Sequence, residues 1–104
     1  MPVLTLDAPV FLEEGEDLVL GWDGIESVDN ADLTVWRNRD GERVWHAWGT
    51  QKSFTVSAVQ PNETSGMELF QQPGSPVLEA GEDYRFRFEF FKSGYEGQVL
   101  EGCV

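Results

Sequence analysis

The side chains best suited to catalysis are few in this chain. It has one histidine, His46, and one cysteine, Cys103. It contains no Gly-x-Ser-x-Gly, no His-x-x-x-His and no glycine-rich phosphate loop. Acidic residues abound, but acid–base catalysis needs groups that converge in one pocket. Zinc needs more His and Cys ligands than this chain offers. The sequence therefore predicts a protein that is not an enzyme and holds no zinc.

A loop rich in side-chain oxygens raises the question of calcium. Its residues with such oxygens are Asp23, Glu26, Asp29, Asn30 and Asp32. Calcium takes roughly six to eight converging oxygens. The spacing here matches no EF-hand loop, and an acidic loop exposed to water explains the same residues. We therefore expect no cofactor, with calcium at the loop 23–32 as the alternative.

Segment 35–48, VWRNRDGERVWHAW, carries the best signal for binding. Asp40-Gly41 is a favoured two-residue type I′ turn, and a turn there pairs residues whose numbers sum to 81. Trp36 then faces Trp45, and opposed residues share a face of a sheet. We therefore predict two tryptophans side by side on the face exposed to water.

The same register assigns the rest of the hairpin to two faces. The predicted core side is Ala31, Leu33, Val35, His46 and Trp48. The predicted outer side is Thr34, Trp36, Asn38, Arg43, Trp45 and Ala47. A one-residue bulge would invert this assignment and bury both tryptophans.

Segment 84–90, YRFRFEF, alternates strictly and predicts a central strand. Its aromatic residues, Tyr84, Phe86, Phe88 and Phe90, are expected in the core, where each buries on the order of 150–250 Å². Next to the hairpin, Arg85 and Arg87 would share the outer face, and an arginine over Trp36 would contribute roughly 0.5–1 kcal/mol. By parity Phe91 points to that face too, unless the strand bulges. The predicted binding surface is thus Trp36, Arg43, Trp45, Arg85 and Arg87.

These segments belong to a pattern of short strands and turns, with no convincing helix. The predicted strands are 3–6 and 10–12 around Pro9, 17–22, 31–37, 43–48, 53–58, 84–90 and 97–104, with a further short one at 67–71. Short connections predict antiparallel pairing, and 104 residues leave room for one core. We therefore predict a single all-β domain, 1–104, folded as a two-sheet antiparallel β-sandwich of about seven strands.

Two stretches, LVLGWDG (18–24) and LEAGEDYRFRF (78–88), resemble a fibronectin type III domain or a close immunoglobulin-like relative. The resemblance implies an inward Trp22 on the second strand. It also implies that Tyr84, which follows Leu78 and Gly81, forms a tyrosine corner before the sixth strand. The segment between 58 and 78 is longer than the family usually carries, so the strand order there stays open.

The net charge of the chain argues against some classes of binding partner. Nineteen Asp and Glu against seven Lys and Arg give a net charge of −12, which argues against nucleic acid and anionic membrane. The first residues lack the pattern of a signal peptide. The resemblance implies a non-catalytic interaction or spacer module of a larger surface or secreted, hence extracellular, protein. Its partner would be a protein or a carbohydrate. The alternatives are a carbohydrate-binding module that uses the tryptophan pair, and a stand-alone oligomeric structural protein of a phage or filament.

Overall fold

The computed structural model describes residues 3–7, 15–62, 65–92 and 99–103. The strands are β1 (Val3–Asp7), β2 (Leu18–Asp23), β3 (Asn30–Arg37), β4 (Arg43–Gly49), β5 (Ser53–Val56), β6 (Tyr84–Phe91) and β7 (Val99–Cys103). The strand predicted at 10–12 and the ends of the one predicted at 97–104 lie outside the described residues.

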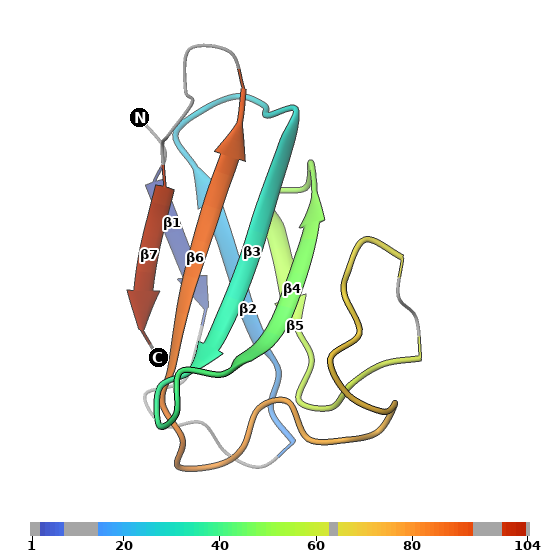
Figure 1. The fold of residues 1–104 in the computed structure, drawn as a ribbon. Coiled ribbons are helices and arrows are strands. Elements are labelled where there is room, and N and C mark those ends of the chain that lie inside the picture. The colour runs from blue at the N-terminus through green and yellow to red at the C-terminus, as the bar shows by residue number, and fades with distance from the viewer. Residues whose placement is uncertain (1–2, 8–14, 63–64, 93–98, 104) are drawn as a thin grey trace.

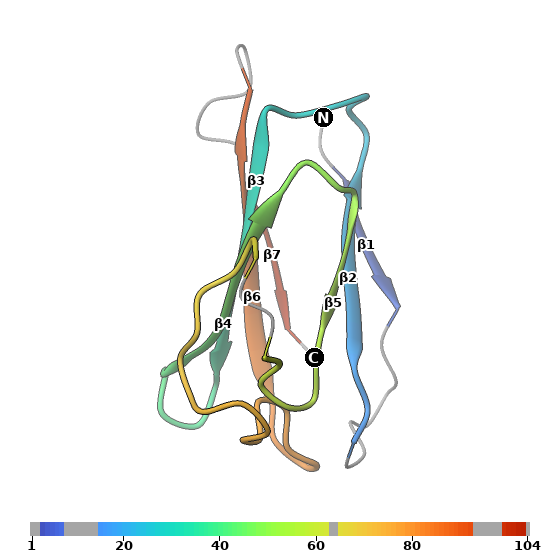
Figure 2. The same ribbon diagram turned by 90° about the vertical axis from the view of Figure 1, so that its right-hand side faces the viewer.

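The strands form two antiparallel sheets that face each other (Figures 1 and 2). One sheet has the order β1-β2-β5 and the other has the order β4-β3-β6-β7. Each pairing is antiparallel. The prediction of an all-β, two-sheet antiparallel architecture is therefore confirmed.

The alternating aromatic residues of β6 fill the space between the sheets. Tyr84, Phe86, Phe88 and Phe90 are all at most 3% exposed. The Phe88 ring lies 5.6 Å from the ring of Phe54, which belongs to the other sheet. Burial of these apolar rings favours folding, and the prediction that they form the core is confirmed.

The corner before β6 is fixed by the buried phenol of Tyr84. Its oxygen accepts a hydrogen bond of 2.8 Å from the backbone N–H of Glu79. Burial, the largest cause, raises the pKa of this phenol. Trp22 is 1% exposed on β2, and its indole N–H donates to the carbonyl of Gln51 at 3.0 Å. Both buried polar groups thus find backbone partners, as buried polar groups generally must.

The segment 65–76, here called the crossing segment, runs beside β4 (Figure 1). It makes two isolated bridges, Ala47 to Met67 and Val59 to Pro76. Only the first lies within 67–71, where a short strand was predicted and none forms. The N–H of Trp48 donates to the carbonyl of Gly66, and the N–H of Glu68 donates to that of His46, both at 2.9 Å. The crossing segment therefore covers part of the β4 edge, which would otherwise offer unpaired backbone groups.

Candidate functional site

The β3–β4 hairpin does not have the predicted register. Val35 pairs with Trp45, whereas Trp36 pairs with Arg43, so the register shifts by one residue at a bulge. In the pairs from Ala31–Gly49 to Val35–Trp45 the two residue numbers add up to 80, and in the pair Trp36–Arg43 they add up to 79. The predicted turn required a sum of 81 in every pair. The predicted pairing of Trp36 with Trp45 is therefore wrong.

The turn explains part of this difference. A type I′ turn needs a positive φ at both central residues, but the described residues other than glycine all have negative φ, Asp40 included. Gly41 alone takes the left-handed conformation here, with φ 70°. Arg37 closes the loop by bonding to both Gly41 and Glu42, each at 2.8 Å. The Asp40 carboxylate accepts a hydrogen bond from the N–H of Glu42 at 3.2 Å, which favours this longer loop.

The bulge places two consecutive residues of β4 in the core. Val44 and Trp45 are each 4% exposed, as a bulge permits because it leaves one residue unpaired. The indole N–H of Trp45 has no acceptor among the described residues. The prediction that Trp36 and Trp45 form an exposed pair is therefore wrong, because Trp45 packs inside.

Of the other hairpin residues, those predicted on β3 have the expected burial, whereas three of those predicted on β4 do not. Ala31, Leu33 and Val35 are buried, as predicted. Ala47 is also buried, whereas Trp48 is 37% exposed and the His46 side chain contacts residues of the outer face. The predicted core positions of His46 and Trp48, and the predicted outer position of Ala47, are therefore wrong.

Three residues on neighbouring strands form a row across the four-stranded sheet, near the end where β3 ends and β4 and β6 begin, which is the lower end of these strands in Figure 1. Trp36 on β3 pairs with Arg43 on β4 and with Arg85 on β6. The guanidinium carbon of Arg85 lies 4.8 Å from the Trp36 ring centroid, and that of Arg87 lies 5.6 Å from it. The predicted stacking of arginine on Trp36 is confirmed, with two arginines in place of one. We call Arg43, Trp36 and Arg85 the Arg–Trp–Arg row.

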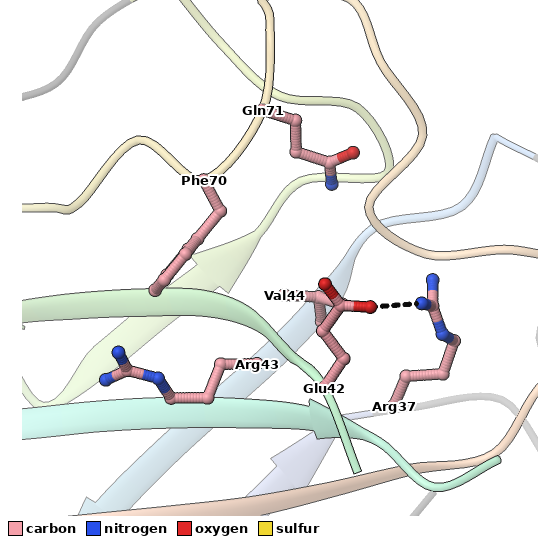
Figure 3. A pocket seen from close by; sticks show the side chains of 6 residues that line it. All are labelled: Arg37, Glu42, Arg43, Val44, Phe70 and Gln71. Atoms are coloured by element: carbon pink, nitrogen blue, oxygen red, sulfur yellow. Dashed lines mark hydrogen bonds and ion pairs between the residues drawn. The ribbon is translucent and has the colours of Figure 1, made fainter. Parts of the chain in front are cut away.

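A pocket of about 190 Å³ adjoins this row at Arg43 (Figure 3). Its lining residues are Arg37, Glu42, Arg43, Val44, Phe70 and Gln71. Phe70 comes from the crossing segment, and its ring centroid lies 5.2 Å from the guanidinium carbon of Arg43. The sequence reasoning missed Phe70 and Gln71, because the crossing segment has no periodic pattern that assigns a direction to its side chains.

Three of the five arginines have carboxylate partners on the protein. The pairs are Arg37 with Asp40 and Glu42 at 2.8 and 3.0 Å, Arg39 with Glu82 at 3.3 Å, and Arg87 with Glu89 and Glu101 at 3.4 and 3.6 Å. The Arg37 guanidinium lowers the pKa of the Asp40 carboxyl to about 2. Arg43 and Arg85 differ, since neither has a carboxylate within ion-pair distance in the part of the chain that the structure describes.

His46 ties the crossing segment to the sheet. One ring nitrogen, Nδ1, lies 2.8 Å from the Glu68 carboxylate, and the other, Nε2, lies 3.5 Å from that of Asp32. The Trp48 ring lies 5.2 Å from the imidazole. Together with the backbone bonds of Gly66 and Glu68, these contacts position Phe70 next to Arg43.

Two acidic side chains of the loop 23–32, those of Asp23 and Asp32, have separate partners on the protein. Asp23 accepts from the N–H of Gly24 and pairs with Lys52 at 3.3 Å, and these contacts lower its pKa, the Gly24 hydrogen bond most. Asp32 accepts from the Asn30 amide at 2.8 Å. Within the described ranges, no group of three or more His, Cys, Asp or Glu side chains is arranged to hold a metal ion.

Comparisons with protein-family models, with curated proteins and with solved structures find no match to this chain. No helix in the described part of the chain is long and apolar enough to cross a membrane.

Proposed function

We propose that this chain is a non-catalytic, fibronectin type III-like module that binds a partner protein through the outer face of its four-stranded sheet. The observation that carries this proposal is the Arg–Trp–Arg row together with the adjoining pocket. Trp and Arg dominate the binding energy of protein interfaces. Here they gather on one exposed sheet face beside a concave site.

Three features support the fibronectin-like assignment. The buried Trp22 lies on the second strand, and the Tyr84 oxygen bonds back to the backbone at Glu79, as in a tyrosine corner. The fourth strand joins the sheet of β3, β6 and β7. In immunoglobulin constant domains the fourth strand joins the other sheet, so the order here favours the fibronectin side of the resemblance.

The non-catalytic part of the proposal rests on where the reactive side chains lie. His46 is on β4 and Cys103 is on β7. These strands are the two opposite edges of the sheet, so the two side chains cannot act on the same atom. The carbohydrate alternative required two neighbouring exposed tryptophans. It loses one of them, because Trp45 is buried in the core.

The test is a selection of binders from a library of random peptides displayed on phage. Wild-type domain serves as bait, and each enriched peptide is then measured against the variant W36S/R43S/R85S. A matched control, R39Q/K52Q, also removes two positive charges, but at positions outside the row. We expect peptides that bind wild type and control alike but bind the triple variant at least tenfold more weakly.

Thermal melts of all three proteins show whether each variant is folded at the temperature of the measurement. Peptides that bind the folded triple variant as tightly as wild type would contradict the proposal. A library that yields no binder to the wild-type domain would contradict it as well.

A further inference from the structure

Two guanidinium groups of the outer face are held in place without using their hydrogen-bond donors on a carboxylate. Arg85 lies over Trp36 at 4.8 Å and Arg43 lies over Phe70 at 5.2 Å. The chain has nineteen acidic residues, yet neither guanidinium has a carboxylate partner among the residues that the structure describes. These two arginines are therefore available to a carboxylate from another molecule.

Stacking suits an arginine for this role. The guanidinium is planar, so it can rest on an aromatic ring while its edge presents N–H donors. Those donors match a carboxylate in a bidentate arrangement. An arginine already stacked on a ring also loses less side-chain entropy when a ligand binds. Arg43 and Arg85 thus resemble two preorganised carboxylate receptors.

Their arrangement defines the shape of the ligand. Arg43 and Arg85 lie on the two strands that flank β3. Adjacent strands are ~4.8 Å apart, so the two backbone positions are separated by roughly twice that distance, with Trp36 between them. The pocket beside Arg43 has Val44 and Phe70 among its walls. Its volume is about 190 Å³.

We propose that the Arg–Trp–Arg row and its pocket receive an acidic peptide segment of a partner protein. One carboxylate binds Arg43 at the mouth of the pocket, an apolar side chain lies across Trp36, and a second carboxylate binds Arg85. This inference rests on the proposed function and adds the chemistry of the partner to it.

The charges around the row favour a short acidic segment over a long polyanion. Glu42, Glu89 and Glu101 lie near the row and remain partly exposed, and the chain carries −12 overall. At physiological salt, charges are screened over roughly 8 Å. A segment that touches only the row meets the two arginines, whereas a sulfated polysaccharide would also run along the neighbouring acids.

The experiment reads the composition of the peptides selected on the wild-type domain. Among those that lose binding to W36S/R43S/R85S, we expect enrichment of Asp and Glu on both sides of an apolar residue. The tightest such peptide is then synthesised with each Glu replaced by Gln and, separately, by Lys. We expect each Gln replacement to weaken binding about tenfold, which corresponds to ~1.4 kcal/mol.

A charge reversal gives the most specific test. The variants R43E and R85E should each bind the acidic peptide at least tenfold more weakly. Each should also regain affinity for the peptide in which the facing Glu is replaced by Lys. The variant R39E, which reverses a charge outside the row, should change neither affinity by more than about twofold. This pattern separates direct pairing from a general change in charge, because R39E alters the net charge equally.

The contradicting outcomes are distinct. Peptides that depend on the row but show no acidic enrichment, or that tolerate Gln replacement, would overturn this inference and leave the proposed function standing. No peptide that depends on the row would overturn both. Heparin that binds the wild-type domain more tightly than the best peptide, and loses binding in R43E and R85E, would replace the acidic peptide by a sulfated polysaccharide.

Discussion

β3 pairs with two neighbours, and the two pairings differ in regularity. With β6 its register runs without a shift from Asn30–Phe91 to Arg37–Tyr84. With β4 the register shifts between Val35 and Trp36. The β6 side follows from sequence alternation alone, because each residue simply takes the opposite face from its neighbour. The β4 side depends on a bulge, which reverses the faces of the residues beyond it.

The irregular side creates the candidate site. The bulge buries Val44 and Trp45 together and leaves Arg43 as the outward residue next to Trp36. The β4 edge is where the crossing segment bonds to the sheet and places Phe70 over Arg43. The regular side supplies Arg85 and Arg87 at positions fixed by the aromatic core behind them. A regular scaffold and one local irregularity thus combine to form the row and its pocket.

The largest expected effect separates the two tryptophans of the hairpin. We expect W45A to lower the free energy of unfolding by about 3–5 kcal/mol, since it empties a large core site. W36A should cost about 1–2 kcal/mol, because it removes a ring that is only partly buried together with an exposed cation–π contact. Urea unfolding measures both.

The variant W45F is a useful control for that pair. It keeps an aromatic ring in the core and removes an indole N–H that has no acceptor in the described residues, so it should cost clearly less than W45A. If W45A and W36A lowered the free energy of unfolding equally, the two tryptophans would have similar environments. The register predicted from a type I′ turn places them in such similar environments, side by side on one face.

A second prediction concerns the regular side, where β7 packs against β6. A Cβ added at Gly102 would lie 2.7 Å from Cζ of Phe86, whose side chain is fully buried. We expect G102A to lower the free energy of unfolding by about 1–3 kcal/mol, as overpacking typically does. V99A, an exposed position on the same strand, should be nearly neutral. A neutral G102A would show that β7 can shift and that the regular register is less constrained than the structure indicates.

A third, smaller effect tests the corner that begins β6. Y84F removes the acceptor of the Glu79 N–H and should cost about 1 kcal/mol at neutral pH. Because burial raises the pKa of Tyr84 above 10.0, the folded state keeps its proton where the unfolded state loses it. Stability linked to this group is therefore present below pH 10 and is lost as pH rises above it.

Unfolding measured from pH 7 to pH 11 in wild type and Y84F checks this dependence. The alkaline loss of stability should be smaller in Y84F than in wild type. Equal losses would place their origin elsewhere in the chain.

The parts of the fold that could be predicted are those set by local pattern. Alternation in 84–90 was enough to place Phe86 and Phe88 in the core. It also placed Arg85 and Arg87 on the outer face, where both contact Trp36. Phe91 follows the same parity and is 47% exposed, but it lies at the far end of β6 from the row.

The parts that could not be predicted depend on contacts between distant segments. Asp40-Gly41 is a strong type I′ signal in isolation, but here Asp40 bonds to Arg37 and Glu42 and the loop lengthens. Burial of Trp45 follows from that loop and from the bulge. Phe70 reaches Arg43 because of hydrogen bonds between the crossing segment and β4. None of these contacts leaves a periodic trace in the sequence.

The smallest expected effect tests the turn that sets the irregular register. The Arg37 guanidinium lowers the pKa of Asp40 from 3.8 to about 2. A carboxyl with a lowered pKa in the folded state stabilises it above the ordinary value, and this contribution is lost as pH falls from about 4 to about 2. Because the pair is exposed to water, its effect on stability should be slight. The titration itself is therefore the better measurement.

Carbon-detected NMR of the Asp40 carboxyl gives the pKa directly. We expect R37Q to raise the Asp40 pKa toward 3.8, because the hydrogen bond from the Arg37 guanidinium is the largest cause of the lowered value. R39Q, which removes a neighbouring charge that contributes least among the causes, should move it much less. An Asp40 pKa near 3.8 in wild type would mean that Arg37 does not hold this carboxylate. The longer loop, and with it the register shift between β3 and β4, would then have to result from the packing of Trp45.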